Sequence, residues 1–234
     1  MLPRLTGSHE AFRNTSRAEF VYRTLSDAIQ QGQLQQGERI REEEVAQSLG
    51  VSRTPVREAL GRLQTRGLLE MAPGRGLIVV ELSKQRITEL YAMREVLEGT
   101  AARFAAQHAA PAEIEALRRL VEEMGNVLDD QQESARLNRF FHHAIYDAAH
   151  NRYLMQVLDE LRDAMALLPG TTYSAEGRTR TSREEHVLIV NAIERRNPAA
   201  AEEAARQHIR EAQRLRLEMI FNVRPRPAAA HGRE

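Results

Sequence analysis

The stretch of chain over 42–82 constrains the fold more than any other part of the sequence. It opens with a short helical pattern that ends at Gly50, a residue that accommodates the left-handed backbone of a tight turn. A second helix is expected directly afterwards, because the Ser52 hydroxyl can accept a bond from a free backbone N–H and Pro55 is tolerated in a first helical turn. A further helical pattern over 16–31 precedes both. Two short helices around a glycine-containing turn are typical of a helix-turn-helix.

The helix expected after Ser52 has two chemically different faces. One face is apolar and consists of Val56, Ala59, Leu60 and Leu63. The opposite face carries Arg53, Thr54 and Arg57. In a helix-turn-helix the second helix enters the major groove with its N-terminal residues, so we expect this cationic face to meet DNA.

A β-hairpin is expected over 67–82. Two β-prone runs flank a glycine-rich turn with the sequence Pro73-Gly74-Arg75-Gly76. Glycines allow a backbone to approach phosphates or the minor groove closely, and the arginine adds a positive charge. We therefore expect a wing that contacts DNA through Gly74, Arg75 and Gly76.

The distribution of charge supports a DNA ligand more than the total does. The formal net charge is +0, which argues at first against nucleic acid. DNA responds to a local patch, however, and between residues 50 and 80 five arginines face only two glutamates. This stretch is locally basic.

Composition excludes several other kinds of protein. The chain has no cysteine, so disulfides, thiolate metal sites and cysteine nucleophiles are excluded. No apolar run approaches the roughly 20 residues that span a bilayer, and no apolar secretion segment is present. We expect a cytoplasmic protein without a membrane partner.

The sequence pattern changes near 82–85, which suggests two domains. We expect a winged helix-turn-helix over 16–83 and an all-helical domain over 84–221. A flexible leader over 1–15 and a flexible tail over 222–234 are expected at the ends. Helical periodicity in the second domain recurs over 85–109, 112–129, 132–149, 152–167, 181–195 and 198–221. The fold class is therefore mainly α, with an antiparallel helical bundle whose core can hold a ligand or metal.

Arg94 falls on the apolar stripe of the first bundle helix, among Ile87, Leu90, Leu97, Ala101 and Phe104. An arginine directed into a core must be paired. Glu98, one turn later, is one candidate partner, and the carboxylate of a bound ligand is the other. The sequence leaves the two alternatives about even.

Three of the eight histidines lie on or beside the apolar stripes of three different helices, namely His142, His186 and His208. The others are expected in the end segments (His9, His231) or facing water (His108, His143, His150). Asn138 precedes His142 by four residues, so both side chains project from one helical face. Three imidazoles and one oxygen donor can hold a divalent transition metal and leave a position for an external ligand. A hydrogen-bonded core histidine remains the alternative at each position.

The N-terminal motifs carry a family resemblance. The run Val51-Ser-Arg-Thr-Pro-Val-Arg-Glu-Ala-Leu60, followed by Leu63, Gly67-Leu-Leu and the Gly-Arg-Gly wing, resembles the DNA-binding domain of GntR-family regulators. The resemblance implies that Arg53 and Arg57 contact bases or phosphates. It also implies that Thr54 contacts the DNA backbone, that Gly76 lies in the wing tip, and that a homodimer binds a near-palindromic double-stranded operator.

The C-terminal motifs resemble the sensor domain of the FadR subfamily of these regulators, called the FCD domain. They are Asn138-Arg-Phe-Phe-His142, Glu185-His186-Val-Leu-Ile-Val-Asn-Ala192 and Ala204-Ala-Arg-Gln-His208, with Arg94-Glu-Val-Leu-Glu98 and Asn151 also fitting. This resemblance implies that zinc or nickel is held beneath a pocket for an organic acid by Asn138, His142, His186 and His208. It implies Arg94 as an effector contact. The two resemblances together cover about residues 16 to 220.

Two departures from the family pattern bear on function. Some members have a DNA-contacting basic residue in the middle of the second helix, a region that reads Glu42-Glu43-Glu44 in this chain, so we do not expect that contact. Many members have aspartate where this chain has Asn138. An amide oxygen can still coordinate a metal, but the affinity is expected to fall and the site becomes more positive, which favours an anionic effector that completes the coordination shell.

These features predict a ligand-responsive transcription repressor rather than an enzyme. Effector binding in the bundle would change the placement of the winged domains through a hinge near 82–85. A metal-dependent hydrolase is one alternative, because a histidine-held metal with an open position can activate water. The sequence has no metalloprotease-like His-Glu-x-x-His spacing to support it. A regulator that responds to the metal itself is the other alternative.

Overall fold

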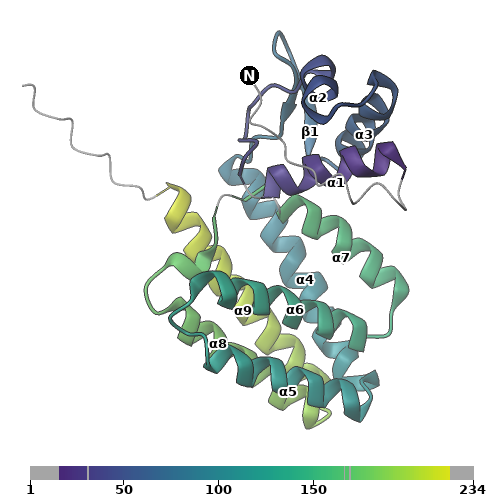
Figure 1. Ribbon diagram of the computed structural model, residues 1–234. Coiled ribbons are helices and arrows are strands. Elements are labelled where there is room, and N and C mark those ends of the chain that lie inside the picture. The colour runs from purple at the N-terminus through teal and green to yellow at the C-terminus, as the bar shows by residue number, and fades with distance from the viewer. Residues whose placement is uncertain (1–15, 31, 166, 169, 222–234) are drawn as a thin grey trace, which may run out of the picture.

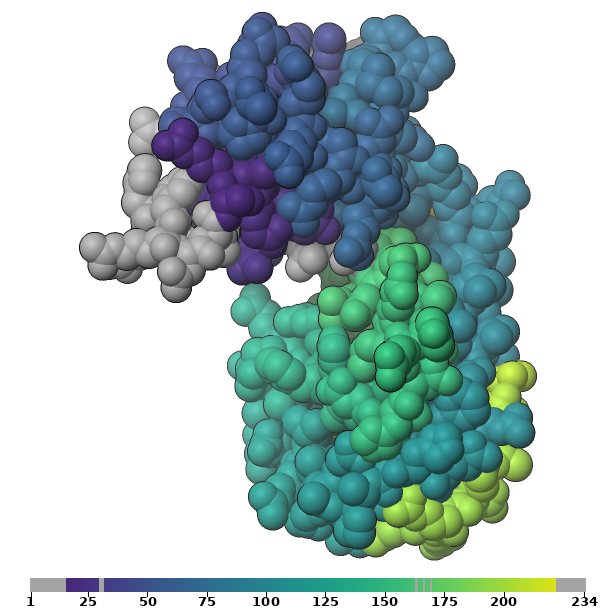
Figure 2. Space-filling view, turned by 90° about the vertical axis from the view of Figure 1, so that its right-hand side faces the viewer, coloured from purple at the N-terminus to yellow at the C-terminus, as the bar shows by residue number. Residues whose placement is uncertain are grey.

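The computed structural model describes residues 16–30, 32–165, 167–168 and 170–221. The expected leader and tail, with His9 and His231, lie outside the described residues. A winged domain lies above a helical bundle, and α4 (Lys84–His108) leads from the first into the second (Figure 1). Figure 2 shows α7 (Arg152–Met165), in bright green, directly beneath the blue winged domain. Within the described parts of the chain, no helix is both long and apolar enough to cross a bilayer.

The winged domain contains three helices and a two-stranded hairpin, which confirms the predicted fold class. Its elements are α1 (Arg17–Gln30), α2 (Glu42–Leu49), α3 (Arg53–Thr65), β1 (Leu69–Ala72) and β2 (Gly76–Val79). Apolar residues from all of them form one core, including Val21, Leu25, Val45, Val56, Leu63 and Val79, each no more than 1% exposed. The apolar side of α3 is therefore fixed against α1, and its charged side faces outward.

The turn between α2 and α3 shows why the two helices separate where they do. Gly50 ends α2 with φ of 65°, in the left-handed region that favours glycine, and its N–H bonds to the Ala46 carbonyl. Ser52 occupies the N-cap position of α3 with extended backbone. The expected cap is wrong in one respect, because the Ser52 side chain accepts no hydrogen bond from the helix.

The hairpin is antiparallel, with Leu69 opposite Val79 and Ala72 opposite Gly76. A segment before α2 adds to it, which the sequence did not predict. The Ile40 N–H donates to the Leu77 carbonyl at 2.9 Å, and the Val79 N–H donates to the Glu38 carbonyl at 2.9 Å. These bonds cover the outer edge of β2 and tie the α1–α2 connection to the wing.

The second domain is the expected helical bundle. After α4 it contains α5 (Pro111–Gly125), α6 (Gln131–Ala148), α7, α8 (Arg178–Glu194) and α9 (Pro198–Phe221), with a short 3₁₀ helix, η2 (Thr172–Ser174), before α8. α4 and α9 pack along each other through small side chains such as Ala101, Ala105, Ala201 and Ala205. At Gly99 a Cβ would come within 2.8 Å of the Arg206 Cγ, so the two backbones approach closely there.

The two domains are joined by more than the start of α4. The Gln36 side chain donates to the Leu167 carbonyl at 2.6 Å and accepts from the Leu82 N–H at 2.9 Å. The Leu167 side chain lies in the core of the winged domain, and that of Leu168 packs on Ile87 in the bundle. The predicted hinge near 82–85 is thus held by a side chain that also binds the α7–α8 connection.

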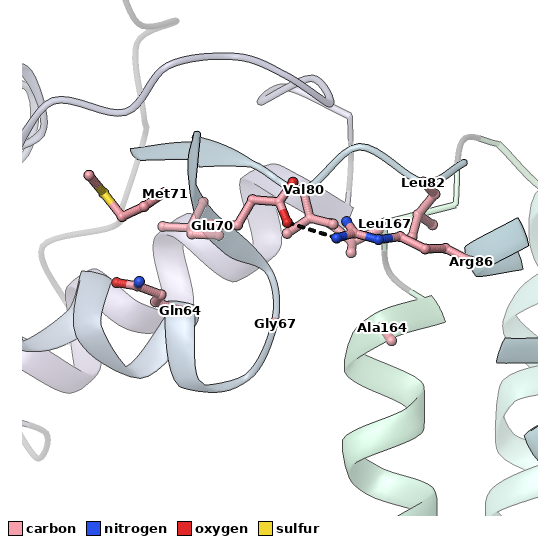
Figure 3. A pocket seen from close by; sticks show the side chains of 10 residues that line it. Gln64, Gly67, Glu70, Met71, Val80, Leu82, Arg86, Ala164 and Leu167 are labelled. Carbon is pink, nitrogen blue, oxygen red and sulfur yellow. Dashed lines mark hydrogen bonds and ion pairs between the residues drawn. The ribbon is translucent and has the colours of Figure 1, made fainter. Parts of the chain in front are cut away.

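An open groove of about 470 Å³ lies beside this junction (Figure 3). The wing base and the end of α7 line it, with Met71, Leu82 and Ala164 among its residues. The Arg86 guanidinium crosses it and meets the Glu70 carboxylate at 3.0 Å. That pair is about half exposed, so it adds little stability.

Candidate metal centre and DNA-contacting face

The outward face of α3 presents the residues expected to meet DNA. Arg53, Thr54 and Arg57 are all exposed, with 57% and 70% of the two arginine side chains accessible. Neither arginine points freely into solvent. Arg57 donates to both carboxylate oxygens of Glu42, at 3.2 Å through Nε and 3.1 Å through NH2. Arg53 lies 3.2 Å from a carboxylate oxygen of Glu43.

The wing tip has the backbone that its glycines predict. Gly74 and Gly76 adopt φ of 71° and 79° in the left-handed region. Arg75 does not extend from the tip. Its guanidinium lies 3.0 Å from the Glu81 carboxylate and donates to the Gly37 carbonyl at 2.6 Å. The wing tip therefore exposes Gly74 together with the Arg75 side chain, which is 52% exposed, and Arg75 must leave two partners to reach DNA.

The three stripe histidines meet in the bundle, from three different helices. His142 comes from α6, His186 from α8 and His208 from α9. One nitrogen of each lies within 4.8 Å of the others, and the Nε2 atoms of His142 and His208 are 3.2 Å apart. Two ligands about 2.1 Å from one tetrahedral zinc are separated by roughly 3.4 Å, so this spacing fits a shared ion. His108, His143 and His150 lie apart from this group.

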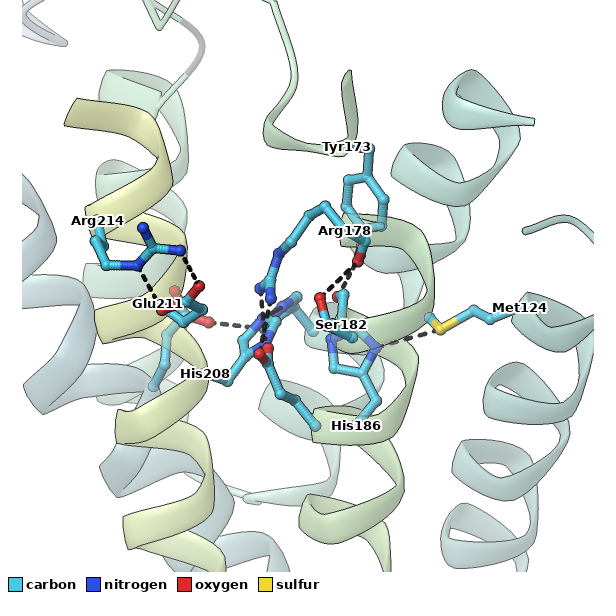
Figure 4. A network of polar contacts seen from close by, with 12 residues as sticks. Met124, Tyr173, Arg178, Ser182, His186, His208, Glu211 and Arg214 are labelled. Carbon is cyan, nitrogen blue, oxygen red and sulfur yellow. Dashed lines mark hydrogen bonds and ion pairs between the residues drawn. The ribbon is translucent and has the colours of Figure 1, made fainter. Parts of the chain in front are cut away.

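Each of the three imidazoles is held through its Nδ1 atom by a different neighbour. Nδ1 of His142 lies 2.7 Å from Oε2 of Glu98, and Nδ1 of His208 lies 2.6 Å from Oε2 of Glu185. Nδ1 of His186 lies 3.2 Å from the Met124 sulfur, which reaches it from α5 (Figure 4). Such partners fix the tautomer and orientation of a ligating histidine.

These partners determine where the imidazole lone pairs point. A carboxylate or a thioether can only accept, so each Nδ1 carries the proton and each Nε2 carries the lone pair. The Glu98 contact is short but poorly aligned as a hydrogen bond; its 2.7 Å separation still requires a proton between the two atoms. Nε2 of His186 is buried and has no hydrogen-bond partner. Three imidazole nitrogens therefore meet in one buried place, an arrangement that suits a cation.

Asn138 is the candidate for a fourth donor. It lies one helical turn before His142 on α6, and its Oδ1 atom is buried without a hydrogen-bond partner. An unpartnered buried amide oxygen is costly, by about 1–3 kcal/mol, unless something else binds it. The orphaned oxygen and the orphaned His186 nitrogen fit the presence of a divalent ion.

Electrostatics keep the histidines in the form that binds metal. Burial, and then the neighbouring His208, His142 and Arg178, hold the pKa of His186 well below its ordinary value. Burial, His142 and Arg178 likewise lower the pKa of His208. Both rings are neutral at pH 7, and neutral imidazole is the species that coordinates metal.

The structure pairs Arg94 with Glu98, the first of the two partners considered from the sequence. Nε of Arg94 lies 2.7 Å from Oε1 of Glu98, and only 11% and 4% of the two side chains are exposed. Burial alone would raise the pKa of Glu98, but Arg94 and His142 together hold it well below its ordinary range. Arg94 therefore borders the histidine site through a carboxylate that touches one of its ligands.

Arg178 is the main site residue that the sequence did not single out. It lies in the first turn of α8, which begins three residues before the expected helix, and it is 3% exposed. Its guanidinium lies 2.7 Å from Glu185 and 3.5 Å from Nδ1 of His208, and its Nε has no partner (Figure 4). The spacing of seven residues between Arg178 and Glu185 was the available signal, because two helical turns bring both to one face.

Comparison with known proteins agrees with both domains. The gntR family of bacterial regulatory proteins matches residues 17–79, and the FCD domain matches residues 89–211. The chain is 30% identical over 218 residues to the Glc operon transcriptional activator of Escherichia coli (strain K12), covering 82% of this chain and 85% of that protein. It is 35% identical over 188 residues to the "Probable D-xylose utilization operon transcriptional repressor" of Paenarthrobacter nicotinovorans, covering 77% and 80%.

A solved structure shares the whole architecture. The structure of E. coli McbR/YncC matches with a TM-score of 0.73 at 25% identity, covering 88% of this chain and 99% of that one. Two family matches therefore fall on the two domains in the order that the fold shows. The chain belongs to the GntR family of bacterial regulatory proteins, in the FadR subfamily that joins a winged helix-turn-helix to an FCD domain.

Proposed function

We propose that this transcriptional regulator is a repressor that releases its operator when a small organic acid binds beside a divalent metal in the FCD domain. The observation that carries the proposal is the meeting of three imidazoles inside the bundle, with one nitrogen of each within 4.8 Å of the others and the orphaned Asn138 oxygen on the same helix as His142. Zinc or nickel would be held by Asn138, His142, His186 and His208, since nitrogen-rich sites suit both ions. A cation held there supplies a Lewis-acidic position for a carboxylate oxygen.

The charge of the site favours an anionic effector. Imidazole and amide groups carry no charge when they coordinate a metal, so a divalent ion held by these four residues would keep its full charge. The nearest carboxylates, Glu98 and Glu185, are already matched by Arg94 and Arg178. A carboxylate ligand would balance the excess positive charge, and either arginine could donate to its second oxygen. Arg94 is the effector contact that we propose first.

DNA recognition is assigned to the winged domain. The exposed end of α3 would enter the major groove with Arg53, Thr54 and Arg57, while Gly74, Arg75 and Gly76 of the wing approach the backbone or the minor groove. A homodimer would place two such helices about 34–36 Å apart on a near-palindromic operator. Support for a dimer comes from exposed apolar side chains on the neighbouring helices α4 and α7, namely Met93, Val96, Tyr153 and Val157.

The junction between the domains offers a route for the signal. Gln36 joins the winged domain to Leu82 and to the Leu167 carbonyl, and the chain after Leu168 leads through η2 to Arg178. An effector that repositions Arg178 would therefore act on a segment whose leucines pack in both domains. A difference of a few kcal/mol between two domain arrangements is enough to change operator occupancy strongly.

Calorimetry with a panel of carboxylates tests the effector site. We expect binding to zinc- or nickel-loaded protein and at least tenfold weaker binding to protein stripped with a chelator. Equal binding to both forms would contradict the metal-dependent site. If adding metal releases the operator when no organic acid is present, the metal itself is the signal.

The direction of control needs its own measurement, because one relative is named as an activator and another as a repressor. A reporter gene placed behind the bound promoter is expected to rise when the regulator gene is deleted. A fall on deletion would replace repression with activation and leave the binding scheme intact. The hydrolase reading is set aside, since the matched families are regulators.

A further inference from the structure

The positive charge of α3 is screened by its neighbour, α2. The Glu42 carboxylate accepts two hydrogen bonds from the Arg57 guanidinium, although 15 residues separate the two in sequence. Glu43 holds Arg53 at 3.2 Å, and Glu42 approaches Arg53 to 3.8 Å. The two arginines and the two glutamates are formally neutral as a group.

Stabilisation of the N-terminus of α2 by acidic residues does not by itself explain this pairing. Acidic residues in a first turn favour any helix through its dipole, and α2 begins with Glu42, Glu43 and Glu44. The dipole requires only that such charges be present. It does not require that two of them reach across to another helix. Glu44, in the same turn, instead binds Arg41 at 3.1 Å.

The pairing affects phosphates and bases differently. Phosphate attraction depends mainly on net charge, so an arginine matched by a carboxylate attracts any DNA less. A guanidinium has five N–H donors, and the Glu42 contact uses two of them in Arg57, which leaves three for acceptors on a base edge. A guanidinium held in one plane also loses less freedom when it meets such an edge.

We propose that Glu42 and Glu43 act as specificity-determining residues: they weaken the attraction of α3 for DNA of any sequence while holding Arg57 and Arg53 in place for base contacts. This role rests on the proposed use of α3 in DNA recognition. It makes the two glutamates part of the proposed recognition surface.

The test compares Glu42→Gln and Glu43→Gln with Glu44→Gln in the full-length protein. Glu44→Gln is a matched control, since it removes the same charge from the same turn without touching α3. Two fluorescent duplexes serve as probes: one of mixed sequence, and one that the wild-type protein selects from a randomised pool. Anisotropy titrations from 50 to 200 mM salt give the affinity and its salt dependence, and thermal melting confirms that each variant is folded.

Glu42→Gln and Glu43→Gln are each expected to bind the mixed-sequence duplex about threefold more tightly at 50 mM salt. The slope of log affinity against log salt should steepen by about 0.9 for each bound subunit, the value for one additional phosphate contact. The selected duplex should gain less, so its preference over mixed sequence falls. Glu44→Gln should leave slope and preference close to wild type.

Two results would overturn this role. One is an unchanged slope and preference in Glu42→Gln and Glu43→Gln, and the other is an equal change in Glu44→Gln, which would reduce the effect to net charge. The mixed-sequence measurement does not depend on an operator. If the wild-type protein selects no sequence from the pool, the proposed recognition of DNA by α3 is wrong. An unchanged salt slope in the glutamate variants contradicts only the screening role of Glu42 and Glu43.

Discussion

The Nε2 atoms of His142 and His208 face each other at 3.2 Å across the bundle, although 66 residues separate them in sequence. Both rings bind a carboxylate through Nδ1, so both Nε2 atoms carry lone pairs. Two lone pairs at this distance repel each other unless a proton or a cation lies between them. The contacts of Glu98 and Glu185 with the two rings therefore favour a proton or a cation between the Nε2 atoms.

Replacing Asn138 tests whether its oxygen belongs to this site. Asn138→Asp adds an anionic donor at the position of the orphaned oxygen, so zinc and nickel affinity should rise at least tenfold. Asn138→Ala removes the donor and should weaken both metals by about 10- to 100-fold. Competition with a chromophoric chelator measures each affinity. Equal affinities in all three proteins would place Asn138 outside the coordination shell.

Arg94 is predicted to have a structural and an effector-binding role that a double variant separates. Arg94→Met leaves the buried Glu98 carboxylate without its guanidinium, which should lower the free energy of unfolding by about 3–5 kcal/mol. Arg94→Met with Glu98→Gln removes both charges and should recover most of that loss in urea denaturation. If Arg94 also touches the effector, calorimetry will show that carboxylate binding stays weak in the double variant. Recovered binding would limit Arg94 to neutralising Glu98.

The fold and the grouping of the three histidines could be predicted from local periodicity together with the family resemblance. His142, His186 and His208 each lie on an apolar stripe, and stripes of neighbouring helices must face one core. The apolar and the charged face of α3 were predicted in the same way, from the helical spacing of the residues around Arg53 and Arg57. In both cases the sequence interval alone determines which side chains share a face.

Other features depend on distances between elements, which the sequence does not contain. The bonds of Ile40 and Val79 along the wing edge arise from how the α1–α2 connection folds back. Arg178 escaped notice because its helix starts three residues earlier than the apolar pattern does. The sequence showed that Glu42 departs from the family pattern. Its contact with Arg57 could not be predicted, because that contact depends on the angle between α2 and α3.

Acid is expected to destabilise the metal-free protein through its buried histidines. His186 and His208 have pKa values lowered from 6.5 by burial and by nearby charges, so below that pH the unfolded chain binds protons that the folded chain does not. Stability is therefore complete above about pH 6.5 and is lost below it, by at most about 1.4 kcal/mol per pH unit for each histidine. Urea denaturation of chelator-treated protein at pH 7.5, 6.5 and 5.5 measures the loss.

Removing one buried histidine should flatten that pH dependence. His186→Phe keeps an aromatic ring beside Phe141 and removes one proton-binding group. His150→Gln is the control, because His150 is exposed and pairs with Glu113 away from the metal site. If His150→Gln flattens the profile as much as His186→Phe does, the acid sensitivity does not come from the metal site.

The last prediction concerns the two hydrogen bonds of Gln36. Gln36→Ala removes the acceptor of the Leu82 N–H and the donor to the Leu167 carbonyl, and so releases the hinge from the α7–α8 connection. Hydrogen exchange of the Leu82 amide should accelerate about tenfold, in line with the loss of roughly 1–1.5 kcal/mol of protection. The same variant should reduce the effect of an active carboxylate on operator affinity, while metal binding stays unchanged because Gln36 lies far from the histidines in sequence and fold. Gln35→Ala is the matched control, since the Gln35 side chain is exposed and the bonds that this residue makes with Glu38 come from its backbone N–H and carbonyl. A protected Leu82 amide together with undiminished coupling in Gln36→Ala would show that the domains communicate by another path.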